Sequence, residues 1–156
     1  MNWDATAAIA EILAAIGVVI SLFYLGRQIR AQNRESRLAA MHEISEAFRD
    51  SYGQFRDGEL AEIMVRGNVD FKSLTDVEKV RLFATLNPLL KVFEEAFWQF
   101  SQDRFDEELC LPMVSQFSFF LGSPTVTQAW EQRRSHYNAN FQKFVDGLDK
   151  QEYKIH

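Results

Sequence analysis

The sequence predicts an all-α protein in which a single N-terminal transmembrane helix continues into a cytoplasmic antiparallel helical bundle. Three observations lead to this prediction. Residues 5–26 form an apolar run with one charged residue, Glu11. Glycine and proline together number only ten among 156 residues, which favours helices over a turn-rich β architecture. After the apolar run, hydrophobic residues recur every three or four positions, and no useful stretch alternates between apolar and polar residues.

The apolar run is long enough to cross a bilayer. As a helix rising about 1.5 Å per residue, its 22 residues span roughly 33 Å, against a hydrocarbon core of about 30 Å. Its isoleucine, leucine, valine and phenylalanine side chains outweigh the cost of one central acid, about 3 kcal/mol on the insertion scale. We therefore expect a transmembrane anchor, and the alternative is a buried helix of a soluble protein.

The residues that flank the run predict its orientation. Residues 1–4 hold no lysine or arginine, whereas a cleaved signal peptide has its positive charges before the apolar run. Four arginines instead follow the run at about one helical turn apart: Arg27, Arg30, Arg34 and Arg37. The positive-inside bias then places the N-terminus outside and the rest of the chain in the cytoplasm. These arginines either set the topology only or also bind anionic lipid headgroups.

A longer pattern overlaps this run. An acidic residue in an Ile/Ala-rich segment is followed by spaced small, apolar and polar residues, which here are Glu11, Gly17, Val19, Ser21, Leu22, Tyr24, Leu25, Gln28 and Arg30. Weaker landmarks lie later in the chain, at Phe93, Glu94, Ala96, Phe97, Ser123, Pro124, Trp130 and Glu131. The pattern resembles a group of short uncharacterised bacterial inner-membrane proteins with one N-terminal transmembrane helix. The resemblance implies a helical protein anchored in the bacterial inner (plasma) membrane, and it brings no activity and no catalytic residues.

The segment after the run predicts a helical stalk followed by shorter helices. The first helix continues outward, with Gly58 as the end of this element, and a short helix covers residues 60–67. Thr75 and Glu78 have the spacing of a capping box, which begins a long helix that Pro88 is expected to kink. The expected core face of that helix is Val77, Val80, Phe83, Leu90, Phe93, Phe97 and Phe100.

Three further helices complete the predicted bundle. A helix over residues 105–121 has Pro112 as an interruption or a first-turn residue. Ser123 and Pro124 mark the N-cap and first residue of the next helix, which carries Val126, Ala129 and Trp130. A last helix uses Phe141, Phe144, Val145 and Leu148. We divide the chain into an anchor (1–30), a cytoplasmic helical domain (31–148) and a frayed tail (149–156).

Glu11 lies on a stripe of small residues within the predicted span. The stripe consists of Ala7, Ala10, Ala14, Gly17 and Ser21, which recur at three- and four-residue steps. Such stripes let two helix backbones approach closely, so this face predicts self-association or docking onto another membrane protein. An ionisable group in hydrocarbon costs free energy unless something compensates it. The alternatives for Glu11 are a snorkelled or hydrated acid and a ring that conducts ions or protons.

The sequence contains no constellation that predicts catalysis. It has no P-loop, nucleophile elbow or dinucleotide-binding glycine motif, and its three histidines lie far apart. The single cysteine, Cys110, excludes an internal disulfide and is expected to be a small core residue. The adjacent acids Glu94 and Glu95 point about 100° apart on a helix, so we expect them on a solvated or salt-bridged face. We therefore expect no enzyme, no cofactor and no metal.

Charge and composition lead to one preferred function. The net charge is −5: residues 1–37 carry a net charge of +1, which leaves −6 for the rest, so nucleic-acid binding is disfavoured. We expect a membrane-anchored structural or accessory protein that contacts lipid and forms a homo-oligomer or part of a larger membrane complex. A homo-oligomeric channel with Glu11 lining the pore is the alternative. A membrane-tethered binder of a lipid or another hydrophobic ligand is a further one.

Overall fold

The computed structural model describes residues 3–102, 104, 107–151 and 153. The protein is 89% helical, and the described residues contain no strand, so the all-α prediction is confirmed. Their six α-helices are α1 (Trp3–Gly53), α2 (Gly58–Val69), α3 (Asp76–Ser101), α4 (Glu107–Leu121), α5 (Pro124–Arg133) and α6 (Ala139–Asp146). Short 3₁₀ turns lie at Gln54–Arg56, Phe71–Ser73 and Arg134–His136.

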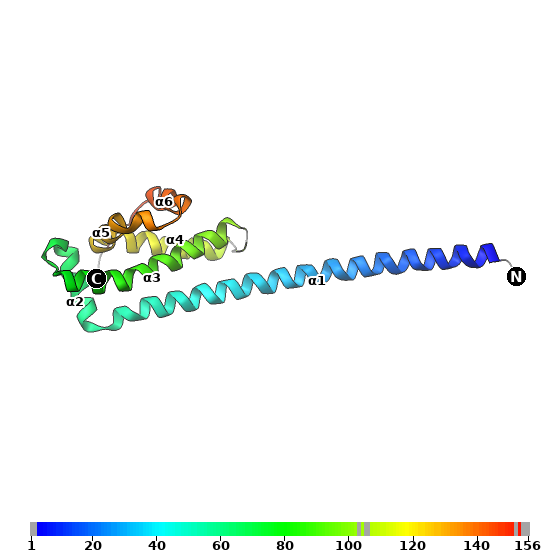
Figure 1. Cartoon of the computed structure of the whole chain (residues 1–156), viewed down its shortest axis with the longest axis horizontal. Coiled ribbons are helices and arrows are strands. Elements are labelled where there is room, and N and C mark those ends of the chain that lie inside the picture. Colours follow the sequence, from blue (N-terminus) through cyan, green and yellow to red (C-terminus); the bar gives the residue numbers. More distant parts are fainter. Residues whose placement is uncertain (1–2, 103, 105–106, 152, 154–156) are drawn as a thin grey trace. The chain divides into compact units, whose positions relative to one another are not determined.

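The chain divides into two compact units between Ala39 and Ala40, and this boundary falls within helix α1. In the first unit the described residues form one uninterrupted helix, drawn in blue to cyan in Figure 1. Its large apolar side chains between Ile9 and Leu25 are 50–77% exposed. By length and composition α1 can cross a membrane, with a mean hydropathy of 2.3 over its most apolar 18 residues. An N-terminal signal sequence has the same properties.

The second unit buries its own hydrophobic core. Helix α3 packs against α2, α4, α5 and α6. At its centre the ring of Phe117 on α4 stacks on Phe93 of α3, with 4.1 Å between centroids, and on Phe141 of α6, at 5.9 Å. Trp130 of α5 meets Phe141 edge-on at 5.8 Å. The unit is therefore a helical bundle held together by contacts among rigid aromatic rings.

Local sequence explains where these helices begin. The side chain of Asp57 caps α2 by accepting a hydrogen bond from the Leu60 amide, at 2.9 Å. The capping box predicted from Thr75 and Glu78 is present at the start of α3. Ser123 caps α5 with Pro124 as its first residue, which confirms the second predicted helix start. Each cap satisfies amides that lack a partner within the first helical turn.

The expected core face of α3 was wrong in part. Val77 and Val80 are 79% and 68% exposed, and Phe100 is also exposed. Three predicted members, Phe83, Leu90 and Phe93, are buried, and the rest of the buried face is Leu82, Thr85, Leu86, Leu89 and Ala96. Apolar residues lie on both sides of this helix, so spacing alone does not identify the side that faces α4 and α6.

Two predicted helix boundaries also differ. Helix α1 ends at Gly53, and Gly58 is the first residue of α2, because the Asp57 side chain caps a new helix there. Pro112 lies inside α4 as its sixth residue, so it is neither an interruption nor a first-turn residue. Pro88 likewise lies inside an unbroken α3. Residues 105 and 106, which the predicted helix included, and the side chain of Cys110 lie outside the described part of the chain.

Helices α2 and α5 touch at a polar junction that depends on Gly67. A Cβ atom at Gly67 would lie 2.7 Å from Thr125 Oγ1 and 3.1 Å from Leu74 Cδ1. Thr125 is fully buried, and its hydroxyl donates to the carbonyl of Met64 at 3.3 Å. Asn68 Oδ1 accepts hydrogen bonds from Ser123 Oγ, at 2.6 Å, and from the Thr125 amide, at 3.1 Å. The two helices can approach this closely only because position 67 has no side chain.

We expect Gly67→Ala to lower the free energy of unfolding of the full chain in detergent by about 1–3 kcal/mol. The added methyl group collides with the side chain of Thr125, which is β-branched and cannot easily move away. Chemical denaturation followed by near-UV circular dichroism measures this change. Gly58→Ala is the matched control, since its Cβ would meet nothing within 4 Å. Equal stability of the two variants would contradict the close approach of α2 and α5.

We expect Glu78 to make stability depend on pH in acid. Arg66, which hydrogen-bonds and pairs with Glu78, and the Thr75 amide lower its pKa from 4.5 to about 2. Because this pKa is lower in the folded state, the charged carboxylate stabilises the fold above about pH 4.5, and that contribution is lost as the pH falls to about 2. Melting temperatures across this window should fall less in Glu78→Gln and in Arg66→Met than in the unchanged protein. An identical pH profile in Glu78→Gln would contradict this assignment.

Candidate functional site

The six residues of the predicted stripe share one side of α1. Helix α1 is continuous through this region, so at about 100° per residue they fall within a sector of roughly 120°. They are Ala7, Ala10, Glu11, Ala14, Gly17 and Ser21, and all are exposed. A Cβ at Gly17 would meet nothing within 4 Å. The stripe is thus an open, shallow face of the helix with a single carboxylate at one edge.

The two polar side chains on this face, Ser21 and Glu11, differ in their hydrogen bonding. The hydroxyl of Ser21 donates to the carbonyl of Gly17 at 2.8 Å, so it is satisfied within the helix and needs no partner in a membrane. Glu11 is an exposed acid at the edge of this face, and Val18, which falls beside it in the same sector, is the one bulky side chain there between residues 7 and 21. Its interpretation as an interface group, a snorkelled acid or a pore-lining acid stays a prediction.

The four arginines after the span lie on the opposite side of α1. Arg27, Arg30, Arg34 and Arg37 fall within a sector of roughly 80° whose centre is diametrically opposite the small-residue stripe. All four are exposed, and Arg30 Nε donates to the carbonyl of Gly26 at 3.1 Å. Bulky residues earlier in the helix share their sector: Ile9, Ile12, Ile16, Val19 and Phe23. Helix α1 therefore has one face of mostly small residues and one bulky, basic face.

The adjacent acids Glu94 and Glu95 make contacts within the fold. Glu94 pairs with Lys91 at 2.5 Å and accepts from the Asn138 amide at 2.6 Å, so it holds the start of α6 against α3. Lys91 also lies 4.3 Å from the ring of Tyr137, and burial, together with the charge of Glu94, raises the pKa of Tyr137 to about 12. Glu95 accepts a hydrogen bond from Gln99. Within the described part of the chain no three metal-binding side chains gather.

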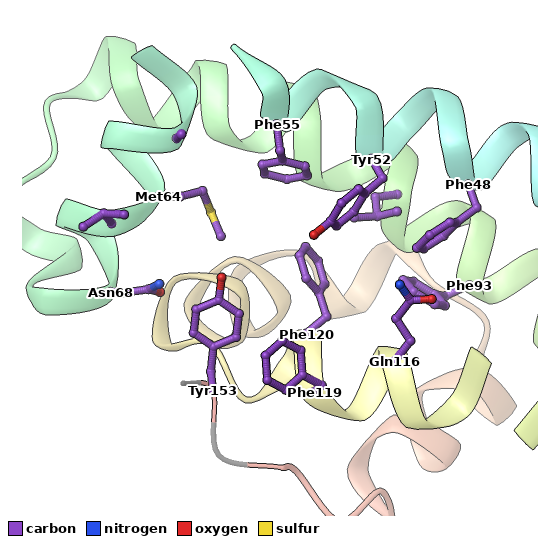
Figure 2. A pocket seen from close by; sticks show the side chains of 13 residues that line it. Phe48, Tyr52, Phe55, Met64, Asn68, Phe93, Gln116, Phe119, Phe120 and Tyr153 are labelled. Carbon is purple, nitrogen blue, oxygen red and sulfur yellow. The ribbon is translucent and has the colours of Figure 1, made fainter. Parts of the chain in front are cut away.

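The second unit contains a cavity of about 270 Å³ that the sequence alone did not reveal. Figure 2 shows it between the last turns of α1, helix α2 and helix α4. Its lining residues are Phe48, Tyr52, Phe55, Ala61, Met64, Val65, Asn68, Leu89, Phe93, Gln116, Phe119, Phe120 and Tyr153. We call this cavity the aromatic pocket. Phe48, Tyr52 and Phe55 recur at three- and four-residue steps, a helical spacing in which nothing distinguishes a pocket wall from a closed core.

The polar groups of the aromatic pocket are few and uncharged. Tyr52 and Tyr153 contribute hydroxyl groups, which Figure 2 shows pointing into the space between α1 and α4. Asn68 and Gln116 contribute amides on opposite sides of the pocket. The oxygen of Asn68 is already used by Ser123 and Thr125. The amide nitrogen of Asn68 therefore remains as a hydrogen-bond donor.

The chain after α6 holds Tyr153 at the edge of the pocket. The hydroxyl of Ser118 donates to the carbonyl of Asp149, and Gln151 Nε2 donates to Ser115 Oγ at 3.3 Å. Gly122 leaves room for this segment, since a Cβ there would lie 1.8 Å from the Gln151 carbonyl oxygen. The ring of Tyr153 then packs on Phe119, with 5.0 Å between centroids. Residues 152 and 154–156 of the predicted frayed tail lie outside the described part.

The neighbours of Tyr153 affect its acidity. Burial, and to a smaller extent Tyr52, raises the pKa of Tyr153 above its ordinary value. The hydroxyl therefore stays protonated at neutral pH and can donate a hydrogen bond into the pocket.

No protein-family model matches this sequence, and no curated protein or solved structure matches it either. The resemblance to short bacterial inner-membrane proteins stays a prediction.

Proposed function

We propose that this chain is a single-pass membrane protein, anchored by residues 5–26, with a non-enzymatic accessory or structural function. The observation that carries the proposal is the exposure of the apolar part of α1, where every large hydrophobic side chain from Ile9 to Leu25 is at least half exposed. Leaving this much apolar surface in water opposes folding and solubility, whereas a bilayer covers it. The second unit needs no such cover, because it closes its own core.

The arginines support an orientation with the second unit in the cytoplasm. They lie directly after the apolar stretch, where basic residues favour the inner side of a bacterial membrane. There the bulky, basic face of α1 directs isoleucine and phenylalanine side chains to lipid tails and arginines to anionic headgroups. The second unit is then an antiparallel helical domain held at the cytoplasmic surface.

The opposite face of α1 supports association with another helix. In lipid the hydrophobic effect does not drive helices together, so close backbone packing at small residues becomes the main attraction. The stripe from Ala7 to Ser21 has this property, and it lies away from the residues suited to lipid. The same stripe on a second copy, or a helix of a larger membrane complex, is the partner that this face fits.

We expect the anchor to be retained and oriented with its N-terminus outside. The protein should resist extraction by alkaline carbonate, and its intact mass should include the apolar helix. A C-terminal fusion to green fluorescent protein should fluoresce, and the matching fusion to alkaline phosphatase should be inactive. Loss of the first helix from the mature mass would identify a cleaved signal sequence and overturn the proposal.

We expect Ala14→Leu and Gly17→Leu to weaken association in the membrane by about ten-fold, because bulk at these positions separates the two backbones. The measurement is the native mass after gentle extraction, together with resonance energy transfer between labelled copies in vesicles. Ala15→Leu adds the same bulk at the next position, about 100° around the helix, and should leave association unchanged. Unchanged association in both stripe variants would remove the stripe from the interface.

A further inference from the structure

The aromatic pocket has the size of a small-molecule site. A cavity of about 150 Å³ lined by apolar side chains holds a benzene molecule. At about 270 Å³ this pocket has room for roughly two fused rings with a small substituent. It is also open to solvent, because Ala61 and Val65 on α2 and Phe119 on α4 are exposed while they line it.

The lining determines the charge of a ligand. Among the thirteen described residues that line the pocket, none is an Asp, Glu, Lys, Arg or His. A charged molecule would lose its hydration without gaining a partner of opposite charge, which is strongly unfavourable. The pocket therefore selects a neutral molecule.

The walls favour a flat ring over a flexible chain. Phe48 and Tyr52 of α1 form a stacked pair at 5.7 Å, and Phe48 meets Phe93 edge-on at 5.6 Å. Phe55 meets Phe120 edge-on at 6.1 Å on another side. The wall is thus built largely of rings that pack on one another in stacked and edge-on pairs, and a further flat ring can join them in the same two geometries.

The polar groups of the pocket favour a ligand whose ring carries a hydrogen-bond acceptor. Tyr52 and Tyr153 approach the pocket from α1 and from the segment after α6, and Figure 2 shows their hydroxyls directed into it. The amide nitrogens of Asn68 and Gln116 are further donors. A ligand without an acceptor would separate these donors from water and leave them unpaired.

We propose that the aromatic pocket binds a neutral, flat aromatic molecule that carries a hydrogen-bond acceptor such as a ketone oxygen. Tyr52 and Tyr153 donate to that acceptor, and the phenylalanine rings cover its faces and edges. This site is independent of the proposed anchoring and association through α1.

The test uses the full chain in lipid nanodiscs, labelled with meta-fluorotyrosine and observed by fluorine NMR at slightly acid pH. The chain has four tyrosines, of which Tyr52 and Tyr153 line the pocket and Tyr24 and Tyr137 do not. Titration with acetonaphthone, a neutral two-ring ketone, should shift the resonances of Tyr52 and Tyr153 saturably and leave that of Tyr137 unchanged. A shift of Tyr24 alone reports partitioning into lipid, and with Tyr52 and Tyr153 unmoved it would overturn the proposal.

Two competing probes test the ligand chemistry. Naphthoate has the same rings and a negative charge, and it should bind at least about ten-fold more weakly than acetonaphthone. Decanol represents a neutral flexible chain and should not compete with acetonaphthone for the pocket. Equal binding of naphthoate, or displacement of acetonaphthone by decanol, would overturn the assignment of a neutral aromatic ligand.

Matched variants test whether acetonaphthone binds in the aromatic pocket. Val65→Trp places a large ring at an exposed position that lines the pocket and should weaken acetonaphthone binding by about ten-fold. Val69→Trp is the control, because Val69 lies about one turn further along α2, is 87% exposed and does not line the pocket. Tyr52→Phe and Tyr153→Phe are each observed through the resonance of the other tyrosine. Each should weaken the binding of acetonaphthone about five-fold and leave the binding of naphthalene unchanged. Equal affinity in all four variants would place the ligand elsewhere.

Discussion

The second unit depends on the contact between Phe93 and Phe117, whose rings stack 4.1 Å apart where α3 faces α4. Other elements reach this pair through further rings. Phe48 brings the last turns of α1 onto Phe93, and Phe141 brings α6 onto Phe117. Because rings are rigid plates with preferred pairing angles, their arrangement limits how these helices can pack.

The aromatic pocket follows from the same rigidity. Phe93 and Phe120 are buried members of the core and also line the pocket, and Phe48 and Phe55 pack beside them. Flexible side chains such as methionine fill irregular gaps, whereas a wall made mostly of rings leaves open the space that their shapes do not match. The opening that remains is bordered by the hydroxyls of two tyrosines and the amides of Asn68 and Gln116.

The two units resolve the problem of apolar surface in opposite ways. In the second unit, leucine and aromatic side chains from several helices exclude water from one another. The described part of the first unit is a single helix, so no element of that unit can cover its isoleucines and valines. Under the proposed function, a bilayer covers the apolar surface of the first unit, while the second unit covers its own.

Local sequence patterns predicted the elements that neighbouring residues control. The long apolar helix, the capping box at Thr75 and the Ser123–Pro124 helix start were predicted correctly, because caps, prolines and apolar runs act over a few residues. Local pattern did not determine which side of α3 is buried, and the choice of Val77 and Val80 was wrong because other helices decide it. Only the tertiary structure brought Phe48, Asn68 and Tyr153 around one pocket. Such a site is made by contacts between distant parts of the chain, and no periodicity within a single helix records them.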